Sequence, residues 1–382
     1  MTALPREQFP VVERYRYFDH AGIAPITKAA GDALRWWAGR YEHQGSLDYD
    51  ELDARMDRAR QSSAALCGVP VDDLAFVKNT TEGLGFVASG LQWQPGDRVV
   101  VPDCEFPSTI YPWLALRALG VEVDLVTPEG DSGAVSVDAF ESVIGAGPAP
   151  KVVATSWVHY GHGWRTDIAR LADVCHGNGA LLCVDAMQGL GVIPADFAAW
   201  NVDFAVAGPH KWLCAPRGVG LFFVASSVRD RLRPLEPGWA SVAHRGEWTN
   251  LDLVWAESAK RFEGGSPNEA GILALGASID VLLHAGVDRI WTHVDHLCDR
   301  LVDGLHALGH VRFLSDRSEA GRSGIVTFAV DGFDSIDVAD HLLREGFACA
   351  PRGGGVRLSP HGYIDEADVD ALVGSVARFV QS

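Results

Sequence analysis

The segment DFAVAGPHKWLCAPRGVGLFFV, residues 203–224, has two apolar runs separated by a loop rich in glycine and proline. The first run, Phe204 to Ala207, leads directly into Gly208-Pro209-His210-Lys211, and the second covers residues 219–224. Continuous apolar runs are typical of strands that are buried on both faces of a sheet. Lysine is almost never fully buried without a partner. The segment therefore predicts a central strand whose end carries a lysine that either extends to solvent or takes part in chemistry.

Five further apolar runs precede this segment and alternate with helix-like patterns. The runs occupy residues 74–77, 98–102, 121–126, 151–157 and 180–186. The helical patterns at 110–120 and 166–179 each end in glycine, which commonly terminates a helix. This alternation predicts an α/β fold, in which a large domain over residues 20–255 holds a mainly parallel seven-stranded sheet sandwiched by helices.

The composition changes after this region, and a smaller α+β domain is predicted over residues 256–382, joined by the N-terminal segment 1–19. Its first helix is expected to begin with Ser266 as N-cap, followed by Pro267 and, three residues after the cap, by Glu269. A second helix is expected over about 288–308. Strand-like and helical patterns follow in alternation, with strands at 323–330 and 355–359 and helices at 337–346 and 366–380.

The composition also limits the kinds of partner. The 382 residues include 32 basic and 50 acidic side chains and carry a net charge of −18, which argues against nucleic acid or an anionic membrane as partner. The seven cysteines form no CxxC pair, and His159 and His162 lack further candidate ligands, so no metal site is predicted. The N-terminal residues lack the apolar core of a signal peptide. We expect a cytoplasmic protein.

Several polar side chains stand where the predicted strands end, and together they indicate a specific chemistry. Thr80 and Thr81 begin a helix after the first strand, a position suited to a phosphate, while Asp185 ends another strand. Each alone also fits a plain helix cap or an ion pair. Pyridoxal phosphate requires an amine, a carboxylate beside its ring nitrogen, a phosphate cradle and a stacking ring. Lys211, Asp185, the threonines and Phe106 supply this combination.

The chain resembles the class V aminotransferase family of fold-type I pyridoxal-phosphate enzymes. The resemblance extends from YFDHAGIAP (17–25) to EADVDALV (366–373) and is strongest over residues 183–224. It implies that Lys211 forms the Schiff base, Asp185 contacts the pyridine nitrogen and Gln188 contacts the ring hydroxyl. It further implies that Phe106 stacks on the ring, that His210 adjoins the cofactor, and that Thr80 and Thr81 bind its phosphate.

The resemblance also implies roles for two residues late in the chain. Ser266, in RFEGGSPN (261–268), matches the segment that reaches the phosphate of a neighbouring subunit, so a homodimer with cofactor sites at the subunit interface is expected. Arg357, in GVRLSPHGYIDEADVD (355–370), matches the arginine that holds the substrate carboxylate. A bidentate guanidinium suits such a planar anion.

Two segments depart from the pattern of the family. The usual Ser-Gly-His-Lys reads Gly208-Pro209-His210-Lys211, so one phosphate-binding hydroxyl is missing. The usual Ser-His-Val-Ser-Asn reads SWVHY over residues 156–160, so Tyr160 replaces an asparagine that normally approaches the cofactor or substrate. We expect Tyr160 and His159 on the substrate side of the pocket.

The resemblance implies an enzyme that acts on an amino acid or amine through an external aldimine and Cα proton transfer, similar to isopenicillin N epimerase. The alternative is a cysteine desulfurase, or a selenocysteine or C–S lyase, that uses Cys349 as a thiolate. Cys349 lies eight positions before Arg357, which leaves little room for a mobile loop, and an inert strand cysteine is the other interpretation. A non-catalytic binding protein that retains the fold is a further alternative.

Overall fold

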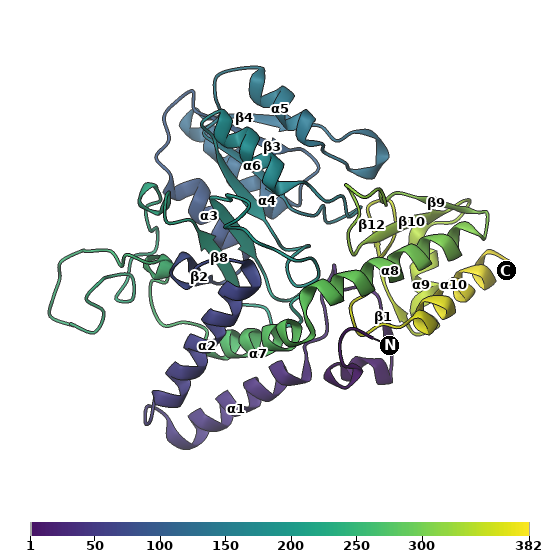
Figure 1. Ribbon diagram of the computed structural model, residues 1–382, viewed down its shortest axis with the longest axis horizontal. Helices are drawn as coiled ribbons and strands as arrows, with labels where there is room; N and C mark the ends of the chain where they lie inside the picture. The colour runs from purple at the N-terminus through teal and green to yellow at the C-terminus, as the bar shows by residue number, and fades with distance from the viewer. Residues whose placement is uncertain (1, 382) are drawn as a thin grey trace.

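The computed structural model describes residues 2–381 and places a seven-stranded sheet at the centre of the larger part of the molecule (Figure 1). The strand order is β2-β8-β7-β6-β5-β3-β4, and β8 alone runs antiparallel to its neighbours. The strands are β2 (Leu74–Val77), β3 (Arg98–Pro102), β4 (Glu122–Val126), β5 (Val152–Ser156), β6 (Leu181–Asp185), β7 (Phe204–Ala207) and β8 (Gly220–Val224). The predicted mainly parallel sheet of seven strands is confirmed.

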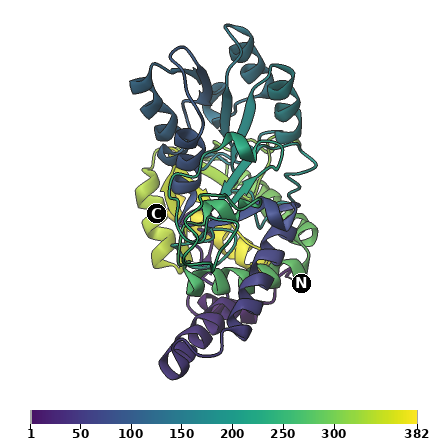
Figure 2. The same cartoon turned by 90° about the vertical axis from the view of Figure 1, so that its left-hand side faces the viewer.

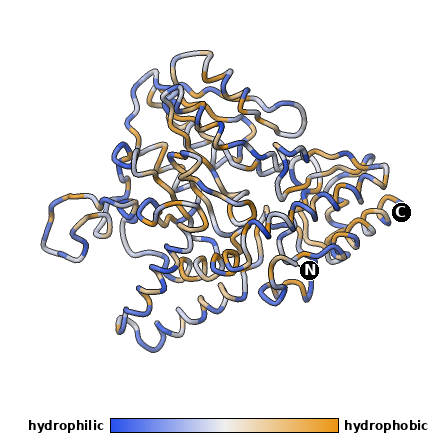
Figure 3. The backbone as a smooth tube through the Cα atoms, in the orientation of Figure 1, coloured by the Kyte–Doolittle hydropathy of each residue, from blue (hydrophilic) through white to orange (hydrophobic). Residues whose placement is uncertain are grey.

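Both faces of this sheet are buried. Successive side chains of a strand point to opposite sides, so each strand contributes to an apolar core on either face. In β3, Val100 belongs to one apolar core cluster, whereas Val99 and Val101 belong to a second. Figure 3 shows the hydrophobic segments concentrated in the sheet and in α7. The helices that connect the strands are α3 (Thr80–Gly90), α4 (Pro107–Leu114), α5 (Val137–Gly145) and α6 (Ile168–Gly177).

Two long helices, α1 (Lys28–Gln44) and α2 (Asp50–Cys67), project from the body of the molecule and pack against α7 (Glu269–Ala285) (Figures 1 and 2). The prediction that Ser266 caps α7 is wrong. Asn268 is the N-cap, and its side-chain oxygen accepts a hydrogen bond from the amide of Gly271 at 3.0 Å. An asparagine placed directly before the helix satisfies a free amide of the first turn, so Ser266 stays outside the helix.

The C-terminal part contains a four-stranded antiparallel sheet in the order β12-β13-β10-β9, which packs against α8 and α9, and α10 packs against these two helices. Its elements are α8 (Val287–His306), β9 (Val311–Phe313), β10 (Val326–Val330), α9 (Ser335–Arg344), β11 (Phe347–Ala348), β12 (Ala350–Arg352), β13 (Gly355–Leu358) and α10 (Glu366–Val380). The N-terminal strand β1 (Arg16–Tyr17) pairs in parallel with β11, which ties the start of the chain to this part.

Short 3-10 helices occupy Arg6–Gln8, Pro10–Glu13, Val71–Asp73, Ala115–Leu119, Gly130–Ser132, Arg229–Arg231 and Ala259–Phe262. Over residues 2–381, no single helix is long and apolar enough to cross a membrane. The pair α7 and α8, bent by 78° at the break between them, reaches that length and composition only when the two are joined.

Candidate active site

Lys211 lies just beyond the carboxyl end of β7, at the edge of the sheet where ligands of open α/β folds bind. Burial lowers the pKa of its amine to about 8, although the nearby carboxylates of Asp185 and Asp19 oppose that shift. Its Nζ stands 5.9 Å from the centre of the Phe106 ring. A lysine with a lowered pKa is more often neutral, which is the form that attacks a carbonyl carbon. Lys211 is therefore suited to Schiff-base formation.

Asp185, the last residue of β6, is held rigidly at the same edge. Its Oδ2 accepts a hydrogen bond from the hydroxyl of Thr109 at 2.8 Å, and its Oδ1 accepts one from the amide of Met187 at 2.9 Å. Burial raises the pKa of this carboxyl group. A positive group beside the carboxylate would offset the desolvation, so the environment fits a pyridinium nitrogen. Thr109 was not recognised in the sequence.

Thr80 and Thr81 stand at the start of α3, whose N-cap Asn79 accepts a hydrogen bond from the amide of Glu82. The hydroxyl of Thr80 is buried and has no hydrogen-bond partner among the described residues. Thr81 Oγ1 lies 2.9 Å from Ser108 Oγ, a residue that the sequence did not reveal. Buried hydroxyls are nearly always paired, so the unpaired Thr80 hydroxyl at a helix N-terminus fits a phosphate oxygen.

Gly208, which stands where the family usually has a serine before its lysine, has a structural explanation. A Cβ atom on Gly208 would lie 2.4 Å from Met187 Cε and 3.2 Å from Thr80 Oγ1. Met187 therefore fills the space that a serine side chain would need. A phosphate bound here would therefore depend on the threonines and the start of α3 rather than on a hydroxyl at position 208.

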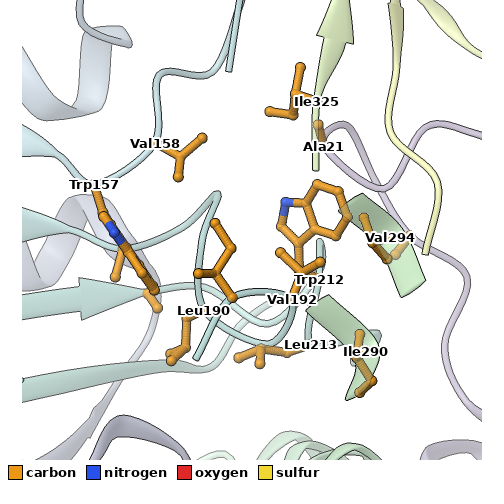
Figure 4. Close-up of a cluster of buried hydrophobic side chains, with 14 of the residues drawn as sticks. Ala21, Trp157, Val158, Leu190, Val192, Trp212, Leu213, Ile290, Val294 and Ile325 are labelled. Atoms are coloured by element: carbon orange, nitrogen blue, oxygen red, sulfur yellow. The ribbon is translucent and has the colours of Figure 1, made fainter. Parts of the chain in front are cut away.

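Gln188 and Trp212 connect the lysine loop to the rest of the molecule. The Gln188 amide donates to the carbonyl oxygen of Ala21 at 3.0 Å and accepts from Trp212 Nε1 at 2.9 Å. Figure 4 shows the Trp212 ring beside Ala21, Ile325 and Val294, side chains that come from three distant segments. This packing holds the residue after Lys211 between the large sheet and the C-terminal part.

Arg357, on β13, is only 3% exposed, and its charge contributes to the lowered pKa of Lys211. Its Nη1 donates to the carbonyl oxygen of Tyr160 at 2.7 Å, and its Nη2 donates to Asp19 Oδ1 at 3.1 Å. Its Nε is buried without a partner among the described residues. A free guanidinium N–H in a buried site fits a substrate carboxylate. Asp19, which lies in the quoted N-terminal motif, is a site residue that sequence reasoning missed.

The loop that carries Tyr160 is supported by two histidines. His159 Nε2 donates to the carbonyl oxygen of Cys104 at 3.0 Å, and its Nδ1 accepts from the amide of His162 at 3.2 Å. Both ring nitrogens are thus used by the main chain, and burial lowers the pKa of His159 to about 4. His159 braces the loop in this conformation. The Tyr160 ring meets the Phe106 ring edge-on, with centroids 5.4 Å apart.

His210 and Ser266 occupy different surroundings. The His210 side chain makes no hydrogen bond with the described residues, and burial followed by the Lys211 charge lowers its pKa to about 4, which leaves a neutral ring beside the lysine. Ser266 is exposed in a hollow lined by Lys78, Glu82 and Glu236, and it too has no hydrogen bond within residues 2–381. The expected contact of Ser266 with a neighbouring subunit stays a prediction.

Glu105, which precedes Phe106, is a buried carboxyl group that sequence reasoning left out. It accepts a hydrogen bond from the amide of Ser156 at 2.5 Å, a second from the Ser156 hydroxyl, and one from Thr155 Oγ1 at 3.3 Å. Burial, with a smaller contribution from Asp185, raises its pKa to about 7. Glu105 thereby fastens the segment of Phe106 to the end of β5.

Cys349 is partly buried in the short segment between β11 and β12. Burial raises the pKa of its thiol to about 12, and the negative charge of Asp19 adds to the shift. A thiol with a raised pKa is mostly protonated at neutral pH and is therefore a poor nucleophile.

Comparison with known proteins agrees with this geometry. The family model for class V aminotransferases matches residues 16–372. A probable cysteine desulfurase of Methanothermobacter thermautotrophicus is 29% identical, over 96% of this chain and 95% of that protein. The uncharacterized aminotransferase YcbU of Bacillus subtilis is 27% identical, over 97% of this chain and 96% of that protein.

Two solved structures show the same fold. The apo cysteine desulfurase of Thermococcus onnurineus superposes with a TM-score of 0.89 at 24% identity, covering 99% of this chain and 98% of that one. The cystine C–S lyase C-DES, in complex with its product cysteine persulfide, gives a TM-score of 0.88 at 24% identity, covering 97% and 99%. The match across residues 16–372 shows that this chain belongs to the class V aminotransferase family of pyridoxal-phosphate-dependent enzymes.

Proposed function

We propose that this enzyme cleaves the C–S bond of a cysteine-type amino acid by β-elimination. Support comes from relatives that are named cysteine desulfurases, together with the chemistry of the cleft. The free Nε of Arg357 is available for the substrate carboxylate, and the amine of Lys211 stands beside Phe106. Elimination begins with the Cα proton transfer that the family resemblance implies.

Each group of the cleft has a task in this reaction. Pyridoxal phosphate, when bound, supplies the electron sink that makes the Cα–H bond acidic. Asp185 would keep the ring nitrogen of the cofactor protonated, while Thr80 and Thr81 would hold its phosphate. Arg357 orients the substrate through its carboxylate. Lys211, with its amine free, would accept the proton from Cα of the substrate.

The leaving group is the sulfur of the substrate. The C–S bond breaks as the Cα proton departs, and the sulfur takes the bonding electron pair as a thiolate or, from cystine, as a persulfide. Water then hydrolyses the remaining three-carbon fragment, which is released as pyruvate and ammonia. No external oxidant or reductant is needed.

We favour β-elimination over desulfuration because the cysteine thiols are mostly protonated and Cys349 lies directly before a tight hairpin. Burial raises the pKa of all seven, namely Cys67, Cys104, Cys175, Cys183, Cys214, Cys298 and Cys349. A desulfurase needs a thiolate that attacks the substrate sulfur, whereas β-elimination needs none. Cys349, moreover, is joined to β13 by the tight turn at Gly353 and Gly354 rather than by a long loop.

The test is the turnover of cystine and cysteine by the holoenzyme and by Cys349→Ser. We expect pyruvate as the product and little change in Cys349→Ser. Cys104→Ser is the matched control, because Cys104 has a similar partial burial and a pKa raised to about 12 by burial and Glu105. Alanine as the product, with turnover lost in Cys349→Ser but retained in Cys104→Ser, would instead establish a desulfurase that uses Cys349.

The assembly that we propose for this function is a homodimer. Ser266 is exposed and unbonded, and the neighbouring loop over residues 236–258 projects from the body of the molecule (Figure 1). This loop exposes Trp248, Leu251 and Leu253, which are 72%, 92% and 64% accessible. Exposed apolar side chains gathered on one loop are typical of an interaction surface.

A further inference from the structure

Arg352 lies on the same face of the C-terminal sheet as Arg357. In the antiparallel pair β12 and β13, Ala350 stands opposite Arg357, and Arg352 is two residues further along β12. Side chains two residues apart in a strand share a face, so both arginines point to one side. Thr327, opposite Arg357 on β10, donates to the carbonyl oxygen of Gly161 at 2.7 Å. This face of the sheet therefore lies against the loop of Tyr160.

The turn that follows Arg352 is fixed in place. Gly353 and Gly354 have φ angles of 62° and 77°, which glycine adopts most readily, and they close the hairpin between β12 and β13. His162 Nε2 donates to the carbonyl oxygen of Gly353 at 2.8 Å. A Cβ atom on Gly353 would approach the His162 ring to 2.9 Å. The hairpin is thus attached to the Tyr160 loop, and the backbone of Arg352 is held beside the cleft.

The guanidinium of Arg352 has no ion pair or hydrogen bond among the described residues, although the chain carries 50 acidic side chains against 32 basic ones. Burial is the main reason that the pKa values of Lys211 and Arg357 are lowered, and the positive charge of Arg352 contributes to both shifts. Asp19 forms an ion pair with Arg357, and the charge of Arg352 also favours the ionised form of Asp19, so both arginines share this one carboxylate. A cation placed near two other cations is unfavourable unless a further anion joins them.

The two arginines stand at different depths. Arg357 is buried near Lys211, whereas Arg352 is exposed on the same face of the sheet, and both are close enough for their charges to lower the pKa of Lys211. A single α-carboxylate on Arg357 leaves Arg352 with only a share of the Asp19 charge. We propose that Arg352 binds a second negative charge on the side chain of the substrate, so that the preferred substrates are cysteine S-conjugates with a carboxylate or similar anion beyond the sulfur. This inference rests on the C–S cleavage proposed above.

The test uses two substrates of nearly equal shape, S-carboxymethyl-cysteine and its neutral amide, S-carbamoylmethyl-cysteine. Elimination releases mercaptoacetate or its amide together with pyruvate and ammonia. A charge-assisted hydrogen bond is worth about 1.5–3 kcal/mol, so we expect kcat/KM for the acid to exceed that for the amide by about tenfold to hundredfold. In Arg352→Gln this ratio should fall close to one. Arg312→Gln is the matched control, because Arg312 is also exposed and unpaired but lies on β9, at the opposite edge of the same sheet.

A binding measurement separates this inference from the proposed reaction. The uncleavable analogue 2-aminoadipate and its side-chain amide replace the sulfur by a methylene group, and their dissociation constants follow from changes in the cofactor absorbance of the holoenzyme. Tighter binding of 2-aminoadipate that depends on Arg352, without release of pyruvate from either conjugate, would refute C–S cleavage but support the second anion site. If the wild type bound 2-aminoadipate and its side-chain amide equally well, the inference would be overturned. It would also be overturned if Arg352→Gln lost the same affinity for both compounds, because that result would assign Arg352 to the α-carboxylate.

Discussion

Arg357 and Asp19, which are 338 positions apart in the chain, form an ion pair with Nη2 and Oδ1 at 3.1 Å. The pair exists because the N-terminal segment runs alongside the end of β13, where Asp19 forms a parallel bridge with Ser359. A carboxylate that bound Arg357 would therefore share the guanidinium with Asp19, and the Nε of Arg357 would be available to it.

Arg357→Ala should raise KM strongly for substrates that carry a carboxylate. Loss of a charge-assisted hydrogen bond of about 1.5–3 kcal/mol corresponds to a decrease of about tenfold to hundredfold in kcat/KM. Arg357→Lys keeps the charge but loses the fork of donors, so it should recover only part of the activity. Steady-state kinetics on the same amino acid measures both variants. An unchanged KM in Arg357→Ala would remove this residue from the substrate site.

Reduction with borohydride should attach the pyridoxyl group to Lys211, as located by peptide mapping. The amine has a pKa lowered to about 8, so half of it is neutral near pH 8 and nearly all of it about one pH unit higher. The rate at which the apoprotein regains its cofactor absorbance should follow this fraction and level off above about pH 9. A label on Lys78, or a rate that keeps rising to pH 10, would contradict the assignment.

Asp185→Asn should retain the fold and cofactor binding but sharply reduce turnover, because the ring nitrogen loses the charge that keeps it protonated. Thr109→Val removes the hydroxyl that donates to Asp185 Oδ2 and should cause a smaller loss in the same direction. The measurements are kcat and the cofactor absorbance spectrum. Wild-type turnover in Asp185→Asn would show that the electron sink does not depend on this carboxylate.

Hybrid dimers test the proposed role of Ser266 in the site of the neighbouring subunit. Ser266→Asp should be inactive, because its charge repels the phosphate, and Lys211→Ala should be inactive for lack of the amine. A mixture of the two should recover roughly a quarter of the wild-type activity, because half of the dimers are hybrids with one intact site. The absence of recovery, despite subunit exchange demonstrated with tagged chains, would show that Ser266 does not complete a shared site.

The sequence by itself was sufficient for the sheet and for the residues at its edge. The apolar runs are continuous because both sheet faces are buried, and parallel strands bring their carboxyl ends to one edge. Lys211 and Asp185 follow such runs directly, so their proximity could be predicted from local pattern. The start of α3 at Thr80 was equally local, because Asn79 caps the helix within four residues.

Only the tertiary structure decided which partners these residues meet. The pairing of Asp19 with Arg357, the hydrogen bond from Thr109 to Asp185 and the binding of Gln188 by Trp212 connect segments that no local pattern relates. The same holds for the Nε2 atom of His159, which donates to the carbonyl oxygen of Cys104. Hydrogen bonds and ion pairs act over a few ångströms, so they depend on how distant segments pack, whereas strands and caps depend on neighbours in the chain.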